Sequence, residues 1–270
     1  MTLEPDPAFL SAAPPPPDRR IQYGPAASQV AELRLPVPMR SDCPVVVMLH
    51  GGFWRARYSA AHLGHAAAAL TQRGLATWNV EYRRVGEASG GWPTTFTDVA
   101  RAIAFLEQLA QEVTLDLSKV VILGHSAGGH LALWSAAAQA TTGVAAWSPR
   151  WRPRGLIGLA AVSDLRLADA LNLSDGAVSG LLGRDSLAAR LAQTSPLELL
   201  PLGLPQVLVH GDLDSVVPPA MSSAYAARAL AVGDPARELR IADCGHFELI
   251  DPTSTAWPSV CEVVSQMLRR

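Results

Sequence analysis

The pentapeptide at residues 124–128, Gly-His-Ser-Ala-Gly, constrains the fold of this chain more than any other feature. An apolar run at 120–123 comes directly before it, and a helix-forming stretch at 129–134 follows. A G-x-S-x-G pattern between a strand and a helix is typical of a strained turn that exposes a serine hydroxyl, while its small residues let the two elements approach closely. A tight turn that only joins two elements is the alternative. The position of the pattern favours an exposed, nucleophilic Ser126.

Composition and charge exclude several classes of protein. The chain has 270 residues and 49% hydrophobic content, which is enough for one α/β domain with a large core. A formal charge of −2 and a pI near 6.4 offer no basic surface for nucleic acid or an anionic membrane. Cys43, Cys244 and Cys261 are an odd number without C-x-x-C spacing, so the sequence predicts neither a disulfide framework nor a zinc site. A reducing, cytoplasmic location fits this pattern.

Residues 1–22 are expected to form an extended, proline-rich arm on the surface of a single domain that covers residues 23–270. The arm contains four consecutive prolines at 14–17. It begins with acidic residues and lacks the basic start and apolar stretch of a secretory signal. No uninterrupted apolar stretch in the chain approaches the roughly 18 residues of a membrane span, so we expect no membrane association.

Short runs rich in Val, Ile and Leu alternate with helical patterns from residue 25 onward. The runs lack polar alternation, which is typical of strands that are covered on both faces. Seven strands are predicted, at residues 30–36, 44–50, 75–82, 119–124, 155–162, 206–210 and 238–242. Strands that alternate with helices predict an α/β fold with a mostly parallel central sheet and helices on both faces. The segment 166–193 is helical in character and longer than a crossover requires, so we expect a small cap over the site.

Parallel sheets bind ligands at the carboxyl ends of their strands, and chemically useful residues follow several of the predicted strands. The strand at 44–50 runs into His50-Gly51-Gly52-Phe53-Trp54. Consecutive glycines let backbone N–H groups turn toward a bound oxygen, as an oxyanion hole requires, and the N–H of Ala127 is the complementary donor. Alone, the two glycines predict only a turn. Together with the serine turn they favour an oxyanion hole.

Two aspartates, Asp212 and Asp214, follow the strand at 206–210, and each is a candidate for the acid of a catalytic triad. Such a carboxylate orients the triad histidine and stabilises its protonated form. Asp214 lies further into the loop and has more room to reach a neighbouring strand end, so we favour it. Asp212 is suited to hydrogen bonds with the turn. Asp164, after the strand at 155–162, is the third candidate.

His246 is the one histidine that follows both Ser126 and the candidate aspartates in the sequence. The order Ser, Asp, His is that of the α/β-hydrolase fold and differs from the orders of the chymotrypsin and subtilisin types. The other histidines are expected in structural positions: His50 and His210 bonded to their loops, His125 and His130 beside the serine, and His62 and His65 partly exposed in an alanine-rich helix. No metal-ligand spacing is present, and we expect no metal or other cofactor.

Further motifs make the chain, from Val30 to the C-terminus, similar to α/β-hydrolases of the esterase and lipase group. Within that group it most resembles the arylformamidase (kynurenine formamidase) and small acetyl or feruloyl esterase-like branch. The motifs that carry this resemblance are Tyr23-Gly24 with Gln29, His50-Gly51-Gly52-Phe53-Trp54, Glu81-Tyr82-Arg83, Trp92-Pro93 with Asp98, and residues 124–130. The resemblance implies Ser126 as nucleophile, Asp214 as acid and His246 as base. It also implies that the N–H groups of Gly52, Phe53 and Ala127 form the oxyanion hole.

One departure from the esterase pattern concerns Phe53. Hormone-sensitive-lipase-like esterases have a third glycine at this position, and the phenylalanine is expected to keep the backbone donor while narrowing the pocket. Trp54, Trp92 and Trp257 are candidates for the pocket lining, whereas Trp78 and Trp134 lie within elements and are expected in the core.

The function favoured by these residues is a serine carboxylesterase that cleaves small acyl esters through an acyl-enzyme. An arylformamidase-type amidase acting on N-formyl-kynurenine-like substrates is the first alternative. An exopeptidase and a hydrolase-like binding protein without catalysis are the others. The expected partner is a small-molecule ester or amide, and the expected state is a monomer or homodimer.

Overall fold

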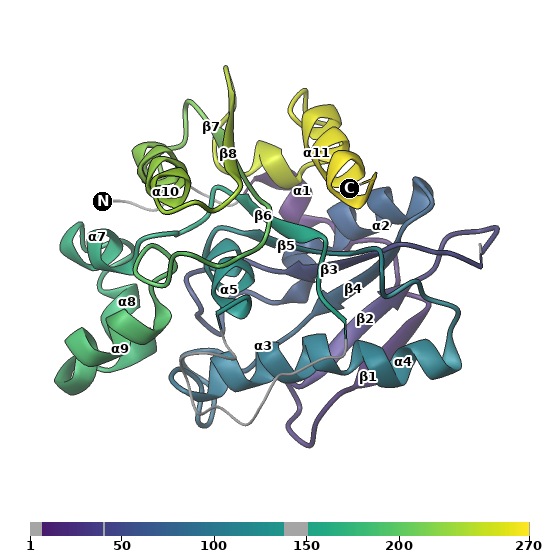
Figure 1. Ribbon diagram of the computed structural model, residues 1–270. Helices are drawn as coiled ribbons and strands as arrows, with labels where there is room; N and C mark the ends of the chain where they lie inside the picture. Colours follow the sequence, from purple (N-terminus) through teal and green to yellow (C-terminus); the bar gives the residue numbers. More distant parts are fainter. Residues whose placement is uncertain (1–6, 40, 138–150, 270) are drawn as a thin grey trace.

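The computed structural model describes residues 7–39, 41–137 and 151–269. The sheet formed by these residues has eight strands in the order β1-β2-β4-β3-β5-β6-β7-β8, with helices on both faces (Figure 1). The strands are β1 (Arg19–Gln22), β2 (Val30–Arg34), β3 (Val45–Leu49), β4 (Ala76–Val80), β5 (Val120–His125), β6 (Gly155–Leu159), β7 (Gln206–Gly211) and β8 (Ala236–Ile241). β2 pairs antiparallel with β1 and β4, and all other neighbours in the sheet pair parallel. The predicted α/β architecture with a mostly parallel sheet is confirmed.

The five inner strands β4, β3, β5, β6 and β7 are buried along their whole length, which explains why their sequences lack polar alternation. Successive side chains point to opposite faces of a sheet. In β3, Val45 and Val47 join the hydrophobic cluster on one face, while Val46 and Met48 join the cluster on the other. All seven predicted strands are present, and their bounds differ from the prediction by at most three residues.

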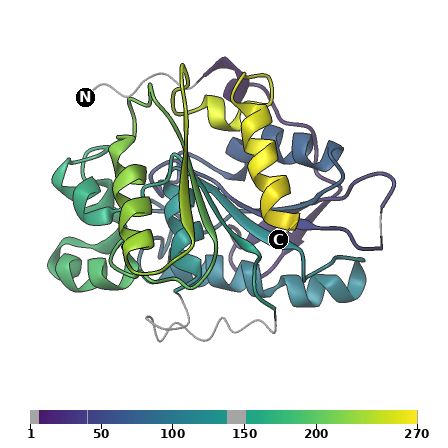
Figure 2. The same ribbon diagram turned by 45° about the horizontal axis from the view of Figure 1, so that its top comes forward.

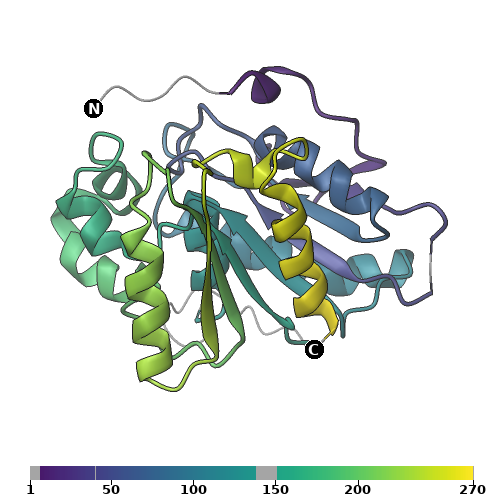
Figure 3. The same ribbon diagram turned by 90° about the horizontal axis from the view of Figure 1, so that it is seen from above.

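Helices pack on both faces of the sheet. Helices α3 (Thr94–Ala104), α4 (Leu106–Glu112), α5 (Ala127–Ser135) and α10 (Ala220–Ala231) contribute to one cluster, and α2 (Gly64–Gln72) and α11 (Trp257–Arg269) lie side by side over the other (Figures 2 and 3). Two short 3₁₀ turns, η1 (Ala60–Leu63) and η3 (Glu248–Ile250), complete this layer. Within the described residues, no helix combines the length and apolarity that crossing a bilayer requires. The three cysteines are buried, and none of them is part of a disulfide.

The end of the predicted arm is part of the sheet, which the sequence does not predict. Arg19–Gln22 form β1, which pairs with β2 at the edge, and Arg20 forms an ion pair with Glu32 (2.8 Å). Before β1, the chain forms a short helix, α1 (Ala8–Ser11), and then contacts the side of α2, where His65 Nε2 donates to the carbonyl of Ala12 (3.1 Å). Because β1 is an exposed edge strand, its sequence need not be apolar. Its adjacent arginines and the preceding prolines therefore give no strand signal in the sequence.

The segment after β6 forms a small group of helices, α7 (Leu165–Ala170), α8 (Ala177–Leu182) and α9 (Leu187–Thr194), with the 3₁₀ turn η2 (Arg184–Ser186) between the last two (Figure 1). Asp164 caps α7, because its Oδ1 accepts the N–H groups of Arg166 (2.9 Å) and Leu167 (3.0 Å). The N–H of Trp92 donates to the carbonyl of Leu181 (2.8 Å) and so ties α8 to the loop before α3. Residues 166–193 are therefore helical as predicted, and Asp164 is the N-cap residue of the first of these helices, α7.

Candidate active site

Ser126 occupies the turn between β5 and α5 in a strained backbone conformation. Its φ of 56° and ψ of −120° lie in a region that non-glycine residues rarely adopt. The glycines at either side are required by close packing: a Cβ on Gly124 would collide with the carbonyl of Gly128, and one on Gly128 would collide with the carbonyl of Leu49. The predicted sharp strand-to-helix turn is present, with Ser126 at its tip.

The loop at residues 50–60 holds three consecutive residues at positive φ: Gly52 at 103°, Phe53 at 49° and Trp54 at 58°. It follows β3 and passes beside the serine turn, where the Cα of Gly51 faces the carbonyl of His125 and the Cβ of Ser126. Ala127 is the first residue of α5, so its N–H is one of the helix donors without an intrahelical partner. The N–H groups proposed for the oxyanion hole thus come from a strained loop and a helix N-terminus that adjoin Ser126.

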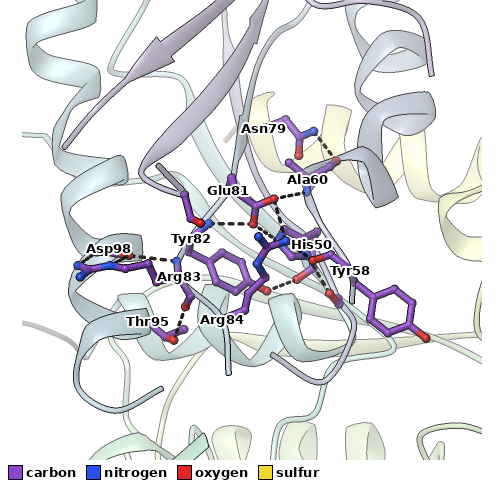
Figure 4. A network of polar contacts seen from close by, with 12 residues as sticks. His50, Tyr58, Ala60, Asn79, Glu81, Tyr82, Arg83, Arg84, Thr95 and Asp98 are labelled. Atoms are coloured by element: carbon purple, nitrogen blue, oxygen red, sulfur yellow. Dashed lines mark hydrogen bonds and ion pairs between the residues drawn. The ribbon is translucent and has the colours of Figure 1, made fainter. Parts of the chain in front are cut away.

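A single carboxylate, that of Glu81, contacts both ends of the 50–60 loop (Figure 4). At the start of the loop, His50 Nε2 donates to Glu81 Oε1 (2.9 Å), and at its end the N–H of Ala60 donates to Oε2 (2.9 Å). Arg84 Nη1 forms an ion pair with Oε2 (3.2 Å) and also donates to the carbonyl of Tyr58. Burial would raise the pKa of Glu81, but the charges and hydrogen bonds of these groups outweigh it and lower the pKa.

The other motifs that carry the family resemblance lie around this carboxylate. Tyr82 stacks on the His50 ring with centroids 4.4 Å apart, and its hydroxyl donates to the carbonyl of His50 (2.7 Å). The Arg83 side chain makes two hydrogen bonds to Asp98, from Nε (2.8 Å) and Nη2 (2.7 Å), and the backbone N–H of Arg83 makes a third (3.0 Å). Gln29 Nε2 donates to the same carboxylate (2.6 Å). These motif residues support the strand ends behind the 50–60 loop.

Asp214 and His246 meet across the loops after β7 and β8. His246 Nδ1 donates to Asp214 Oδ2 (2.7 Å), and both side chains are buried. The N–H groups of Val216 and Val217 donate to Asp214 Oδ1 (each 2.8 Å). Burial raises the pKa of Asp214, but hydrogen bonds from two histidines lower it well below its ordinary value. Asp212 instead pairs with Arg240 (2.8 Å) at the surface, so the structure brings the favoured aspartate to His246.

A second histidine, His210, shares the same carboxylate oxygen. Its Nε2 lies 3.0 Å from Asp214 Oδ2 and 3.0 Å from the carbonyl of Val217, both of which accept hydrogen bonds. Nε2 therefore carries the proton, and Nδ1 accepts from Ser222 Oγ (2.7 Å). The sequence predicts His210 bonded to its own loop, and the contact with the Asp214 carboxylate comes in addition.

Two buried histidines, His62 and His125, lie beside the serine turn and His246. His125 Nε2 donates to the carbonyl of His246 (3.0 Å), so its Nδ1 accepts from His62 Nε2 (3.0 Å). Burial lowers the pKa of His62 to about 3 and that of His125 well below its ordinary value. The expectation that His62 is partly exposed is wrong, because η1 directs the ring against His125, whereas His65 is half-buried as expected.

Ser126 and His246 line one cavity of about 70 Å³, together with Gly52 and Phe53. Its remaining lining residues are Arg55, Arg57, Tyr58, His62, His125, Ser174, Val216 and Phe247. Ser174 belongs to the helical insertion, where Arg55 donates to the carbonyls of Ser174 and Asp175. Arg55, Arg57 and Tyr58 come soon after the His-Gly-Gly motif, but no local pattern in the sequence marks them as lining residues.

Known proteins resemble this arrangement in sequence and in structure. Residues 32–228 match the family model described as BD-FAE. The chain belongs to the BD-FAE family. Esterase LipC from Mycobacterium tuberculosis is 26% identical over 270 residues, which cover 88% of this chain and 61% of LipC. The chain thus spans about three fifths of LipC's length.

Two further comparisons concern a formamidase that matches part of this BD-FAE chain and an esterase of similar structure. Kynurenine formamidase from Danio rerio is 30% identical over 112 residues, which cover 42% of the chain and 36% of that protein. Inhibited esterase B from Lactobacillus rhamnosis has a similar structure, with a TM-score of 0.80 at 21% identity, over 97% of this chain and 89% of that chain. The BD-FAE chain has the α/β-hydrolase fold.

The three candidate tryptophans of the BD-FAE chain lie outside the cavity lining. Trp54 is buried with its ring edge against His130 of α5 (centroids 5.2 Å apart), and Trp92 packs against Phe96 of α3 (5.0 Å). Trp257 begins α11 and is buried in the cluster on the opposite face of the sheet. The described lining of the cavity includes none of the three, and their indole rings pack against helices on either side of the site. Among the described residues, no group of three acidic, histidine or cysteine side chains is placed to hold a metal ion.

Proposed function

We propose that this chain is a serine carboxylesterase with Ser126 as nucleophile, His246 as general base and Asp214 as the acid that orients it. The observation that carries the proposal is that the strained Ser126 turn and His246, whose ring is hydrogen-bonded to Asp214, border the same cavity. The similarity to an esterase over 88% of the chain supports the ester as the bond that is cleaved.

Each residue has one role in the proposed reaction. His246 Nε2 takes the proton of the Ser126 hydroxyl while its oxygen attacks the ester carbonyl, and Asp214 stabilises the imidazolium from the Nδ1 side. The N–H groups of Gly52, Phe53 and Ala127 donate hydrogen bonds to the negatively charged tetrahedral oxygen. His246 then protonates the departing alcohol, which leaves an acyl group on Ser126. A water molecule, deprotonated by His246, attacks this acyl-enzyme and releases the carboxylic acid.

The size of the cavity favours short acyl groups. Its volume is about 70 Å³, and Phe53 lies in its wall directly beside the proposed oxyanion donors. A longer acyl chain would have to displace packed side chains, which is costly in a dense protein interior. Formyl, acetyl and propionyl groups are therefore the proposed acyl range.

An arylformamidase activity is the second candidate. The match to a kynurenine formamidase covers 42% of this chain at 30% identity, and a formamide would use the same residues as an ester with an amine as the leaving group. No observation favours an exopeptidase or a non-catalytic binding role. The cytoplasmic location and the monomeric or homodimeric state stay predictions.

Removal of the nucleophile tests the proposal. In Ser126→Ala, kcat for p-nitrophenyl acetate is expected to fall by a factor of about 10⁵ or more, because loss of a triad nucleophile leaves only binding and the oxyanion hole. The melting temperature should stay near that of the parent, since the hydroxyl supports no element. Parallel assays with N-formyl-kynurenine decide between the ester and the formamide. Parental turnover in Ser126→Ala would show that Ser126 is not the nucleophile.

A further inference from the structure

The 50–60 loop needs an external support to keep its shape. Phe53 and Trp54 are non-glycine residues with φ of 49° and 58°, and together with Gly52 they form a run of three residues at positive φ. Such a conformation persists only where the surrounding structure determines it. The direction of the Gly52 and Phe53 N–H groups depends on this run, so whatever holds the loop also sets the geometry of the proposed oxyanion hole.

Contacts at the two ends of the loop converge on one side chain (Figure 4). Glu81 Oε1 accepts from His50 Nε2 at 2.9 Å, and Glu81 Oε2 accepts from the Ala60 N–H at 2.9 Å. Its own backbone is fixed in turn, because the N–H of Glu81 donates to the carbonyl of Val30 in β2 (3.0 Å) and the N–H of Tyr82 donates to Oε1 (3.1 Å). A rigid strand end thus holds the two ends of the loop a fixed distance apart.

Charge strengthens these contacts. Glu81 is buried and faces the His50 ring and the Arg84 guanidinium, and Arg84 is also paired with Glu87 (2.7 Å). Hydrogen bonds to an ionised carboxylate are about twice as strong as those between neutral groups. The lowered pKa of Glu81 agrees with a carboxylate that stays ionised at neutral pH.

We infer that Glu81 is a positioning residue for catalysis: through His50 and Ala60 it holds the Gly52 and Phe53 N–H groups in the orientation that stabilises the tetrahedral oxyanion. Glu81 is absent from the described lining of the cavity, so it acts through the loop and not on the substrate. The inference rests on the proposed function, because it assumes that Gly52 and Phe53 are oxyanion donors.

The test replaces Glu81 with an isostere and compares it with a matched control. In Glu81→Gln, the amide group keeps the size of the side chain but loses its negative charge. Its NH₂ faces either the Ala60 N–H, which then loses its acceptor, or the His50 ring, which must then move its proton to Nδ1 beside the Gly51 carbonyl (2.8 Å). We expect kcat for p-nitrophenyl acetate to fall about 100-fold, the effect of losing one oxyanion donor. KM should change less than about threefold, because the oxyanion forms only in the transition state.

Glu87→Gln is the control, since Glu87 binds Arg84 on the side away from the loop and its other side-chain partner is Ser28 (2.8 Å). This variant removes a carboxylate from the same arginine and is expected to keep kcat within about threefold. An equal loss of kcat in both variants would show that the ion-pair network acts only on stability, and would overturn the inference.

Two readouts separate positioning from a general loss of structure. A trifluoromethyl ketone, which forms a tetrahedral adduct with the serine, should bind Glu81→Gln about 100-fold more weakly, whereas binding of the product acetate should not change. The pH at half-maximal kcat/KM should stay at the parental value, because the His246–Asp214 pair is untouched. Unchanged adduct affinity in a folded Glu81→Gln protein would refute the positioning role.

A second variant covers the case in which Glu81→Gln does not fold. His50→Gln removes the ring that joins Glu81 to the start of the loop, and it is expected to lower kcat by a similar factor. If it folds and keeps parental kcat, the inference fails. Failure of the proposed function is recognised separately: Ser126→Ala would then retain activity, or a phosphonate inhibitor would not label Ser126, whatever the behaviour of the Glu81 variants.

Discussion

The two halves of the site are built in different ways. On the oxyanion side, the 50–60 loop is strained and is held at both ends by the charged Glu81 side chain. On the acid–base side, Asp214 receives two backbone N–H groups and two histidine rings, while the residues of its own loop have ordinary backbone angles. Fixing the direction of a main-chain N–H requires control of the loop itself, whereas placing a side chain requires only partners for its polar atoms.

This difference predicts different sensitivities. A change on the oxyanion side disturbs the backbone and should lower kcat with little effect on the titration of the base. A change on the acid–base side alters the protonation of His246 and should change the pH profile as well. The four predictions below test this distinction, from the largest expected effect to the smallest.

The largest effect is expected on the acid–base side, in Asp214→Asn. The amide cannot stabilise the imidazolium, and kcat should fall about 10⁴-fold, as in other triads with this substitution. Asp212→Asn is the control, because Asp212 pairs with Arg240 at the surface, and it should change kcat less than about threefold. Steady-state kinetics that rank the two variants in the reverse order would assign the acid to Asp212.

Acyl length tests the oxyanion side. With Phe53 in the wall of a cavity of about 70 Å³, p-nitrophenyl acetate should be hydrolysed with a kcat/KM about 100-fold higher than that of the octanoate. Phe53→Ala should reduce this ratio, because it removes the ring and keeps the backbone donor. Equal rates for both esters in the parent protein would contradict a narrow acyl pocket and the formamidase alternative with it.

A smaller effect is expected from His210, which acts through Asp214. In His210→Gln, the carboxylate loses one of the donors on Oδ2 that His246 also uses, and kcat should fall about tenfold, in line with loss of a hydrogen bond to a charged group. The pH at half-maximal kcat/KM should differ from the parental value, because the carboxylate that faces the His246 ring loses a hydrogen bond. Ser222→Ala, which removes only the partner of His210 Nδ1, is the milder companion variant. An unchanged pH profile in His210→Gln would remove the proposed difference between the two halves.

The smallest effect is expected on the pH dependence of the free energy of unfolding, through the buried ring of His62. Burial lowers the pKa of His62 from 6.5 to about 3, so below pH 6.5 the unfolded state takes up a proton that the folded state refuses. Stability should therefore fall as the pH drops from 6.5 toward 3, with a slope of up to about 1.4 kcal/mol per pH unit for this ring. The carboxylates Glu81 and Asp214 have lowered pKa values, and their stabilisation is lost only at lower pH, below their ordinary values of 4.5 and 3.8. Urea unfolding of the parent and His62→Gln between pH 6.5 and 4.5 checks this, and parallel curves would contradict it.

Much of the fold follows from local patterns in the sequence. The strands β3 and β5 are runs of Val, Ile, Leu and Met that only a doubly covered sheet can bury, and the Gly-x-Ser-x-Gly turn marks the strand end at which they meet. The order of Ser126, Asp214 and His246 along the chain was sufficient to choose residues that the fold brings to one cavity or into contact.

Other features depend on contacts that no local pattern encodes. The hydrogen bonds of Glu81 to His50 and Ala60 join residues that are far apart in the sequence. The motif Glu81-Tyr82-Arg83 does not reveal these partners. The burial of His62 depends on its partner His125, which lies 63 residues away. A large ring near a motif is equally consistent with a pocket wall and with helix packing, so the sequence does not decide where the tryptophans lie. For Trp54, the backbone at φ 58° and the contact of its ring with His130 show that it packs against α5.

The edge strand β1 has a consequence for the behaviour of the molecule in solution. An unpaired sheet edge is a template for association with another chain, and β1 presents two exposed arginines there. Without residues 1–22 the edge would pass to β2, in which Ala31, Glu32, Leu33 and Arg34 are buried in the intact protein. A chain shortened by residues 1–22 is therefore expected to expose this partly apolar strand and to lose solubility.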